Sequence, residues 1–286
     1  MLAASSPLHN AVQSPQFNGW KASLDLTFCR SEHRTTLRFK HLGPLRIQKA
    51  LYPDGQGCCH AVIVHPPGGI AGGDQLNLNT DVGPSAHALV TTPAATKWYG
   101  TFDDAVASQT IQIKLSGRLE WLPAETIVFD HANVRSRISI KAEKSASMLG
   151  WDLLIFGRQG SAEDFTLGQF EQWLAIEFED GLVWLDRLSL KGSDPLLESP
   201  VGFNGNRALS CLWAIAPSDE PWSDELVDQL RHNFVSIAAT RLHPRLLVIR
   251  HLGDPIELQL QLKKVWQWLK KNVWLLDAND LRLWAT

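Results

Sequence analysis

The chain has 286 residues, of which 44% are hydrophobic and 20% are charged, and its net charge is −3. This composition is typical of a folded globular protein, and so small a net charge provides no overall field that would attract nucleic acid or an anionic membrane. Residues 1–16 lack the basic start and apolar run of a signal peptide, and no stretch approaches the ~18–20 apolar residues of a membrane-spanning helix. We therefore expect a soluble, cytoplasmic protein that binds neither nucleic acid nor membrane, with residues 1–18 as a flexible segment before a single domain, 19–286.

Short segments of alternating apolar and polar residues dominate the first three quarters of the chain. The alternation has the two-residue period of a strand with one buried face, and turn signals rich in Gly, Pro and Asn separate the segments. The pattern is found in residues 24–28, 37–41, 76–82, 111–115, 134–140 and 170–178. Many short strands at fairly even spacing predict a mainly β fold.

The segment His65–Asp74 is the most unusual part of the sequence, because it places two prolines and four glycines between two apolar runs. A hairpin connection needs only two to five residues, so the extra length predicts a shaped loop with His65 at its entrance and Asp74 at its exit. The glycine spacing matches neither a dinucleotide-binding motif nor a P-loop, and a strand pattern follows instead of a helix. The physics of the motif alone favours a wide structural turn over a ligand site.

Two later segments are apolar on both faces, which is typical of strands that lie between two layers and therefore predicts stacked sheets. They cover residues 149–157 and 182–188. Each contains one acid, Asp152 in the first and Asp186 in the second. A buried carboxylate is costly unless it is paired or hydrogen-bonded. One explanation is structural pairing, with Arg187 or Arg158 as the partner of Asp186; the other is a polar passage through the core that suits a hydrated divalent cation in transit.

Helical patterns appear only late in the chain. Ser223 can cap a helix over residues 223–237, and Asp254 followed by Pro255 is a strong start for a second helix over 254–271. Between them, residues 245–251 have the apolar middle of a strand. The expected architecture is a mainly β protein with two helices in the C-terminal third.

Motifs for catalysis or tight metal binding are missing from the sequence. It contains no Gly-x-Ser-x-Gly elbow, no His-x-x-x-His and no Cys-x-x-Cys, so an enzyme is not expected. Cys59 and His60 are weak metal-ligand candidates, and His60 and His65 lie an odd number of positions apart, on opposite faces of an extended strand. We expect no tight metal site. The 12 tryptophans suit cores and protein interfaces, but they also leave open a carbohydrate-binding or carbohydrate-active β protein.

A linear series of motifs gives the chain a resemblance to a known family. The most specific is His-Pro-Pro-Gly-Gly-Ile-Ala-Gly-Gly-Asp at residues 65–74. The others lie, in order, at residues 43–49, 51–53, 59–60, 91–99, 119–123, 151–154, 157–158 and 246–250. On these residues the chain closely resembles the urease accessory protein family UreD, called UreH in some bacteria.

The resemblance implies a non-catalytic maturation chaperone that binds apo-urease together with UreF and the GTPase UreG and helps deliver nickel to urease. It implies an irregular, β-helix-like stack of sheets, no tightly bound cofactor, and transient nickel. An internal nickel passage would involve Asp74, Asp152 and Asp186, with His65 and Glu125 as further candidates. The family-motif loop would comprise Pro66, Pro67, Gly68, Gly69, Gly72 and Gly73 together with Lys97 and Tyr99. A nickel-storage protein is the remaining alternative.

Four positions depart from the family pattern. Ala124 stands where a glutamine is usual, Gly100 replaces a frequent arginine, and Gln75 follows Asp74 where some members carry an acid. Cys58 is an extra thiol beside the expected cysteine. These changes concern individual ligand assignments within the expected site.

Overall fold

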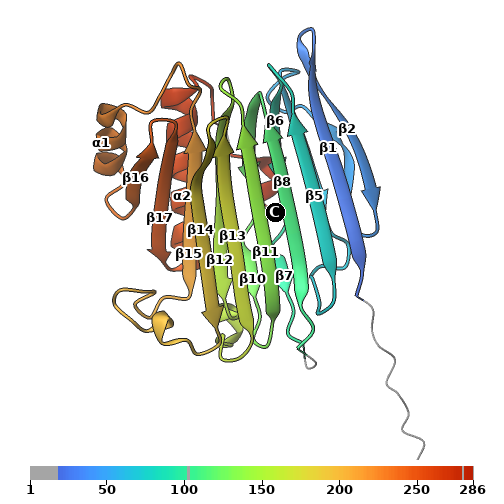
Figure 1. Cartoon of the computed structure of the whole chain (residues 1–286), viewed down its shortest axis with the longest axis vertical. Helices are drawn as coiled ribbons and strands as arrows, with labels where there is room; N and C mark the ends of the chain where they lie inside the picture. Colours follow the sequence, from blue (N-terminus) through green and yellow to red (C-terminus); the bar gives the residue numbers. More distant parts are fainter. Residues whose placement is uncertain (1–18, 102–103, 279, 286) are drawn as a thin grey trace, which may run out of the picture.

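The computed structural model describes residues 19–101, 104–278 and 280–285. The predicted flexible segment 1–18 lies outside the described residues, and the single domain 19–286 stays a prediction. The described residues form two β-sheets and two α-helices, which confirms the mainly β fold. Figure 1 looks onto one sheet, with the second sheet and the longer helix behind it.

The first sheet has seven strands among the described residues. In spatial order they are β14 (Gly181–Lys191), β13 (Gln169–Phe178), β11 (Asn133–Ala142), β8 (Ala107–Leu115), β5 (Gln75–Val82), β1 (Lys21–Ser31) and β2 (Arg34–Leu42). The five strands from β13 to β1 are parallel, and an antiparallel strand closes each edge.

The second sheet has ten strands among the described residues. Its main path is β16 (Ala238–His243), β17 (Leu246–Gly253), β15 (Ala208–Ile215), β12 (Ser147–Phe156), β9 (Arg118–Leu122), β6 (His87–Thr91), β4 (Cys58–Val64) and β3 (Arg46–Leu51). Two short strands lie off this path, β10 (Thr126–Val128), which pairs with β12, and β7 (Thr96–Trp98), which pairs with β10.

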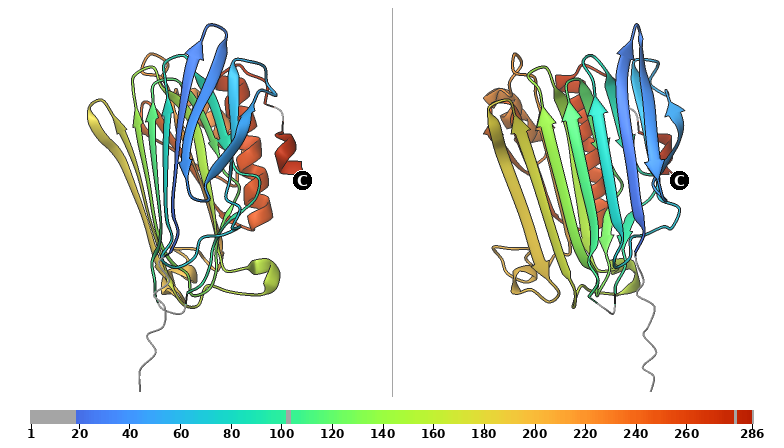
Figure 2. Two further views of the ribbon diagram at one scale, coloured as in Figure 1. Left: turned by 90° about the vertical axis from the view of Figure 1, so that its right-hand side faces the viewer. Right: turned by 45° about the vertical axis from the view of Figure 1, so that its right-hand side comes forward.

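The chain passes back and forth between the two sheets. From β4 to β13 the long strands alternate between the second and the first sheet. Within each sheet, every strand of this run is parallel to the strand of the run that precedes it there. This winding confirms the expected β-helix-like stack. Figure 2 (left) shows the two layers side by side, with the long helix against the face of the second sheet that points away from the first.

Strand β12 confirms the interpretation of residues 149–157 as a two-faced strand. Met148, Leu154 and Phe156 pack into the core between the sheets. Leu149 and Trp151 point the other way, into a second core between the sheet and the helices. One strand therefore supplies both cores, which is why its sequence lacks an apolar–polar alternation.

The same interpretation of residues 182–188 is wrong. Strand β14 is at the edge of the first sheet, and the side chains of Leu182 and Leu185 are 58% and 56% exposed. An apolar run cannot by itself distinguish a buried strand from an edge strand with apolar residues on its outer face.

Two helices lie in the C-terminal third, as predicted. Helix α1 (Asp224–Asn233) begins after Ser223, whose hydroxyl accepts a hydrogen bond from the Leu226 amide, but it ends before the predicted limit at residue 237. Helix α2 (Pro255–Val273) begins after Asp254, whose carboxylate accepts from the amides of Ile256 and Glu257. Neither helix is both long enough and apolar enough to cross a membrane.

Candidate functional site

The Pro/Gly loop lies against strand β7. The Ile70 amide donates to the Lys97 carbonyl at 2.7 Å, and the Tyr99 amide donates to the Ile70 carbonyl at 2.8 Å. A Cβ on Gly69 would lie 2.3 Å from the Tyr99 ring, so no larger residue fits without displacing that ring. Tyr99 is held in turn by an edge-on contact with Phe129, at 5.1 Å between ring centroids. The glycine pair therefore allows a close approach of backbone to an aromatic side chain.

Asp74 holds the C-terminal end of this loop in place through its side-chain carboxylate. One carboxylate oxygen accepts from the Trp20 amide at 2.7 Å, and the other accepts from the Ala71 amide at 2.9 Å. The residue is only 7% exposed. Both oxygens are thus engaged by backbone donors, an arrangement that fixes the loop to the start of β1.

A cavity of about 220 Å³ opens between the two sheets beside this loop. Its titratable lining residues are His65 of the loop, Lys97 of β7 and Asp152 of β12, and the rest of the wall is apolar apart from Gln109 and three threonines. Burial lowers the pKa of His65, and nearby Asp74 offsets part of that effect. The structure therefore brings three of the predicted residues, His65, Lys97 and Asp152, to one cavity.

Asp152 points into the space between the sheets. The side-chain amide of Gln172, on β13, donates to its Oδ2 at 2.6 Å. Burial raises the pKa of Asp152 from 3.8 to about 7, because that hydrogen bond only partly compensates for lost hydration. At neutral pH the carboxyl group therefore exists in both protonation states.

Asp152 also lines a second cavity, of about 30 Å³, which has room for about two waters. Asp186 lines this cavity as well, and it also lines a third, larger hollow of about 620 Å³. The first and second cavities thus share Asp152, and the second and third share Asp186. Taken together, the three cavities extend from beside the Pro/Gly loop to a hollow lined by residues of β14, β16 and β17.

Asp186 forms an ion pair with Arg250 of β17, at 2.7 Å between Oδ2 and Nη2. Neither partner proposed from the sequence is correct, since Arg187 lies 3.6 Å from Glu171 and Arg158 pairs with Glu163. The two side chains of the Asp186 pair are about 36% and 46% exposed. The pair therefore lies in a hydrated position at the mouth of the cavities.

Glu125 lies apart from these cavities. Its Oε2 accepts a hydrogen bond from the Gln259 side chain of α2 at 3.3 Å, and it lines a small hollow beneath that helix. It is therefore on the helix side of the second sheet, whereas Asp152 is on the inter-sheet side.

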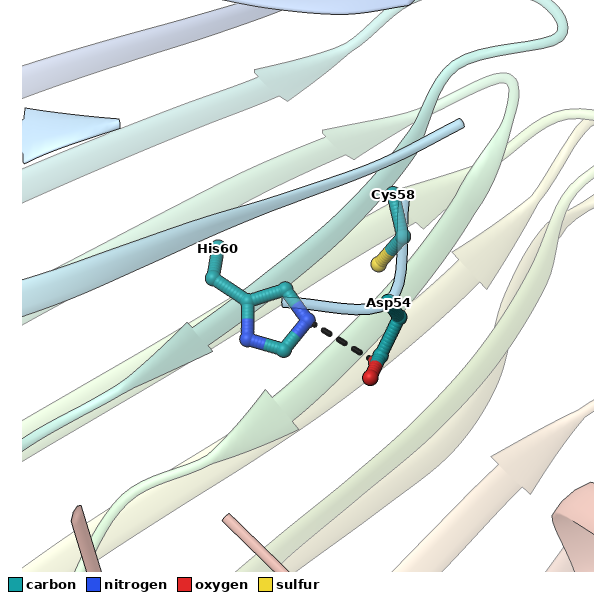
Figure 3. A group of neighbouring side chains, drawn as sticks. All are labelled: Asp54, Cys58 and His60. Carbon is teal, nitrogen blue, oxygen red and sulfur yellow. Dashed lines mark hydrogen bonds and ion pairs between the residues drawn. The ribbon is translucent and has the colours of Figure 1, made fainter. Parts of the chain in front are cut away.

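The two weak metal-ligand candidates are not brought together either. Cys59 is fully buried in the core between the sheets, whereas His60 faces α2. His60 instead lies beside Cys58 and Asp54, and the three side chains point toward one another (Figure 3). The two-residue period of a strand puts Cys58 and His60 on one face, so the sequence contained the signal for this cluster.

These features describe a scaffold protein: two sheets wound around a line of cavities, with acids at the junctions between them. Comparison with known proteins gives the family. Residues 21–285 match the family model described as UreD urease accessory protein. The chain therefore belongs to the UreD urease accessory protein family, which confirms the resemblance seen in its motifs.

Relatives named urease accessory protein UreD match from about two thirds of the chain to nearly all of it. The one from Variovorax paradoxus is 35% identical over 278 residues, which is 93% of this chain and 99% of that protein. The one from Cupriavidus necator is 37% identical over 278 residues, 93% and 95% of the two chains. A third, from Acinetobacter baumannii, is 42% identical over 200 residues, 69% of each chain.

Proposed function

We propose that this chain is a urease maturation chaperone that acts without catalysis of its own. It binds apo-urease together with UreF and the GTPase UreG, and it passes nickel, held only transiently, through the cavities between its two sheets. Family membership supports the link to urease. The line of cavities supports the role in nickel transfer.

The observation that carries the proposal is the sharing of Asp152 and Asp186 by successive cavities. A divalent cation cannot cross an apolar core unless charge and water replace its hydration. The smallest of the three cavities has room for about two waters and is lined by both carboxylates. Carboxylates with waters suit a hydrated divalent ion in transit.

The arrangement favours transit over storage. Within the part of the chain that the structure describes, Asp152 has a single hydrogen-bond donor, and its pKa is about 7, so an arriving cation displaces only a loosely held proton. Asp186 is already paired with Arg250, which weakens its attraction for a second cation. A storage site needs several ligands converging on one ion, and among the described residues neither acid belongs to a group of three or more closely spaced metal-ligand side chains.

The carbohydrate alternative rested on the 12 tryptophans. Seven of them are buried among the described residues: Trp98, Trp121, Trp151, Trp213, Trp222, Trp266 and Trp274. A ring that stacks on a sugar must be accessible, so most of the tryptophan content belongs to the two cores instead. The tryptophans therefore give little support to a sugar-binding surface.

The test is to express the Asp152→Asn chain with urease and UreF- and UreG-type partners at limiting nickel. Urease nickel content should fall, because a neutral amide attracts a cation less than a carboxylate does, while partner capture stays unchanged. The matched control is Asp81→Asn, which neutralises an exposed acid of β5. Full urease nickel content in the Asp152→Asn strain would contradict the proposed nickel passage.

A further inference from the structure

The helix side of strand β4 carries a cluster that the nickel passage does not use. Alternation along β4 points Cys58 and His60 toward α2 and Cys59 toward the other sheet. Asp54, from the turn before β4, reaches the same place. One ligand atom from each of Asp54, Cys58 and His60 lies within 4.8 Å of the other two, and Figure 3 shows the three side chains converging.

We propose that Asp54, Cys58 and His60 form a binding site for a divalent transition-metal ion of the zinc or nickel kind. Thiolate, imidazole and carboxylate together make a donor set for borderline-soft ions, and hard ions such as magnesium or calcium prefer oxygen alone. Three protein ligands leave a fourth position for water.

The spacing of the donor atoms suits such an ion. Bonds of ~2.0–2.3 Å at tetrahedral angles place ligand atoms about 3.3–3.7 Å apart. Nε2 of His60 already lies 3.1 Å from Oδ2 of Asp54. The widest separation in the cluster, within 4.8 Å, closes to this range by a movement of about 1 Å. The Asp54 side chain, in a turn and 34% exposed, can supply the movement and gives the ion a way in.

A neighbouring group, Cys58 with His87 and Glu120, has equally close atoms, but its carboxylate is already satisfied. Glu120 accepts from His87 at 2.8 Å and from Trp266 at 2.7 Å, and it lies 3.1 Å from the Lys270 ammonium. Among the described residues, the Asp54 carboxylate has one short contact, with His60 at 3.1 Å, and Lys270 lies 3.9 Å away. The ion therefore belongs on the Asp54 side of Cys58.

The local charges also favour a cation beside Cys58. Asp54, Glu120 and a Cys58 thiolate contribute three negative charges against two positive charges from Lys270 and Arg118, so a further cation is favoured here. Cys58 is 4% exposed, so its thiolate needs a partner of this kind. The site lies on the opposite face of the second sheet from Asp152. A negative result for this metal site therefore leaves the proposed passage untouched, and the reverse also holds.

The test is titration of the metal-free full chain with Co²⁺ as a spectroscopic probe, followed by displacement with Zn²⁺ or Ni²⁺. We expect one equivalent to bind, with a thiolate-to-cobalt charge-transfer band in the near ultraviolet. Cys58→Ala should abolish the band. Cys59→Ala is the matched control, because the adjacent thiol is equally buried but faces the other sheet, and it should keep the band.

The Asp54→Asn variant tests whether the ion lies on the Asp54 side of Cys58 or on the Glu120 side. This substitution at an exposed turn should weaken binding by at least the roughly tenfold that loss of an outer-shell partner costs. A wild-type chain without the band, or a band that survives Cys58→Ala, overturns the proposal. So does a band that depends on His87 but not on Asp54. Should Cys58→Ala fail to fold by circular dichroism, Asp54→Asn carries the test alone.

Discussion

Two acids on the second sheet, the buried Glu120 and the half-buried Asp152, have pKa values shifted in opposite directions. Glu120 on β9 and Asp152 on β12 come from neighbouring strands but point to opposite faces. Burial raises the pKa of both. For Glu120 that effect is outweighed by a hydrogen bond from His87, the charge of Lys270 and a hydrogen bond from Trp266, so its pKa falls below the usual range. For Asp152, Gln172 is the one side-chain donor among the described residues, and the pKa rises to about 7.

The difference shows that the number and charge of the donors, more than depth, decide whether a buried acid stays ionised. Glu120 is a permanently charged anchor between the sheet and α2. Asp152 sits beside cavities with room for water and can exchange its proton for another cation. The first arrangement stabilises the fold, and the second keeps a group available for function.

The largest effect is expected from removing the cation beside Glu120. Lys270→Met should lower the free energy of unfolding by about 3–5 kcal/mol, because it leaves a buried carboxylate without its charged partner. Denaturant unfolding measures this. Lys271→Met, at an exposed position one residue on, is the control and should stay within about 0.5 kcal/mol of wild type. Equal stabilities for the two variants would show that Glu120 does not depend on Lys270.

The next effect is a pH dependence caused by Asp152. The folded chain keeps this proton up to about pH 7, whereas the unfolded chain releases it near pH 3.8. The folded state binds more protons in this window, so its stability falls as pH rises through it. An acid whose pKa rises from 3.8 to about 7 loses roughly 4 kcal/mol of folding free energy once ionised.

Asp152→Asn isolates that contribution, since it removes the titrating group and leaves the histidines, whose own titration is common to both chains. Unfolding free energies of wild type and variant, measured from pH 4 to pH 8, should diverge in favour of the variant as pH rises. Parallel curves would mean that Asp152 is as well compensated as Glu120.

Loss of the Asp74 carboxylate should have an intermediate effect. Asp74→Ala leaves the amides of Trp20 and Ala71 without their acceptor, at a cost of about 1–3 kcal/mol. Thermal melting measures the loss. Asp74→Asn can keep one of the two hydrogen bonds, so its melting temperature should lie between those of wild type and Asp74→Ala. A purely structural acid would lower urease activation only in proportion to the folded chain that remains. A greater loss of activation per folded molecule would give Asp74 a functional role as well.

Much of the fold could be predicted from local patterns. The strand alternation, the helix-capping residues Ser223 and Asp254, and the two-faced segment 149–157 all have local physical causes. Strand β14 was misjudged because its sheet edge, a long-range feature, decides its exposure. The first helix was predicted too long because Phe234 and Ile237 keep the helical spacing but pack into the core from beyond its end.

The site was harder to predict than the fold. Asp152 and Asp186 could be singled out as acids in apolar runs, but their partners Gln172 and Arg250 come from other strands, and no local pattern pairs them. The cluster around Cys58 could have been found in part. Its cysteine and histidine share a strand face, whereas Glu120 and Lys270 lie far away in sequence.

Asp186→Asn should change the free energy of unfolding least of all these variants. Its effect on nickel transfer can be compared directly with that of Asp152→Asn. The pair with Arg250 is more than a third exposed on both sides, so losing it should cost no more than about 1 kcal/mol. At the mouth of the cavities, however, the variant leaves Arg250 as an uncompensated positive charge, which repels a divalent cation. Nickel content of urease at limiting nickel should therefore fall at unchanged melting temperature.

Arg250→Gln tests the same mouth with the opposite sign. It removes the competing cation and frees the Asp186 carboxylate, so nickel content should be at least that of wild type. If both substitutions lower nickel content equally, the intact ion pair matters as a structural contact and the charge at the mouth does not. If neither changes it, nickel does not pass Asp186, and the line of cavities ends at Asp152.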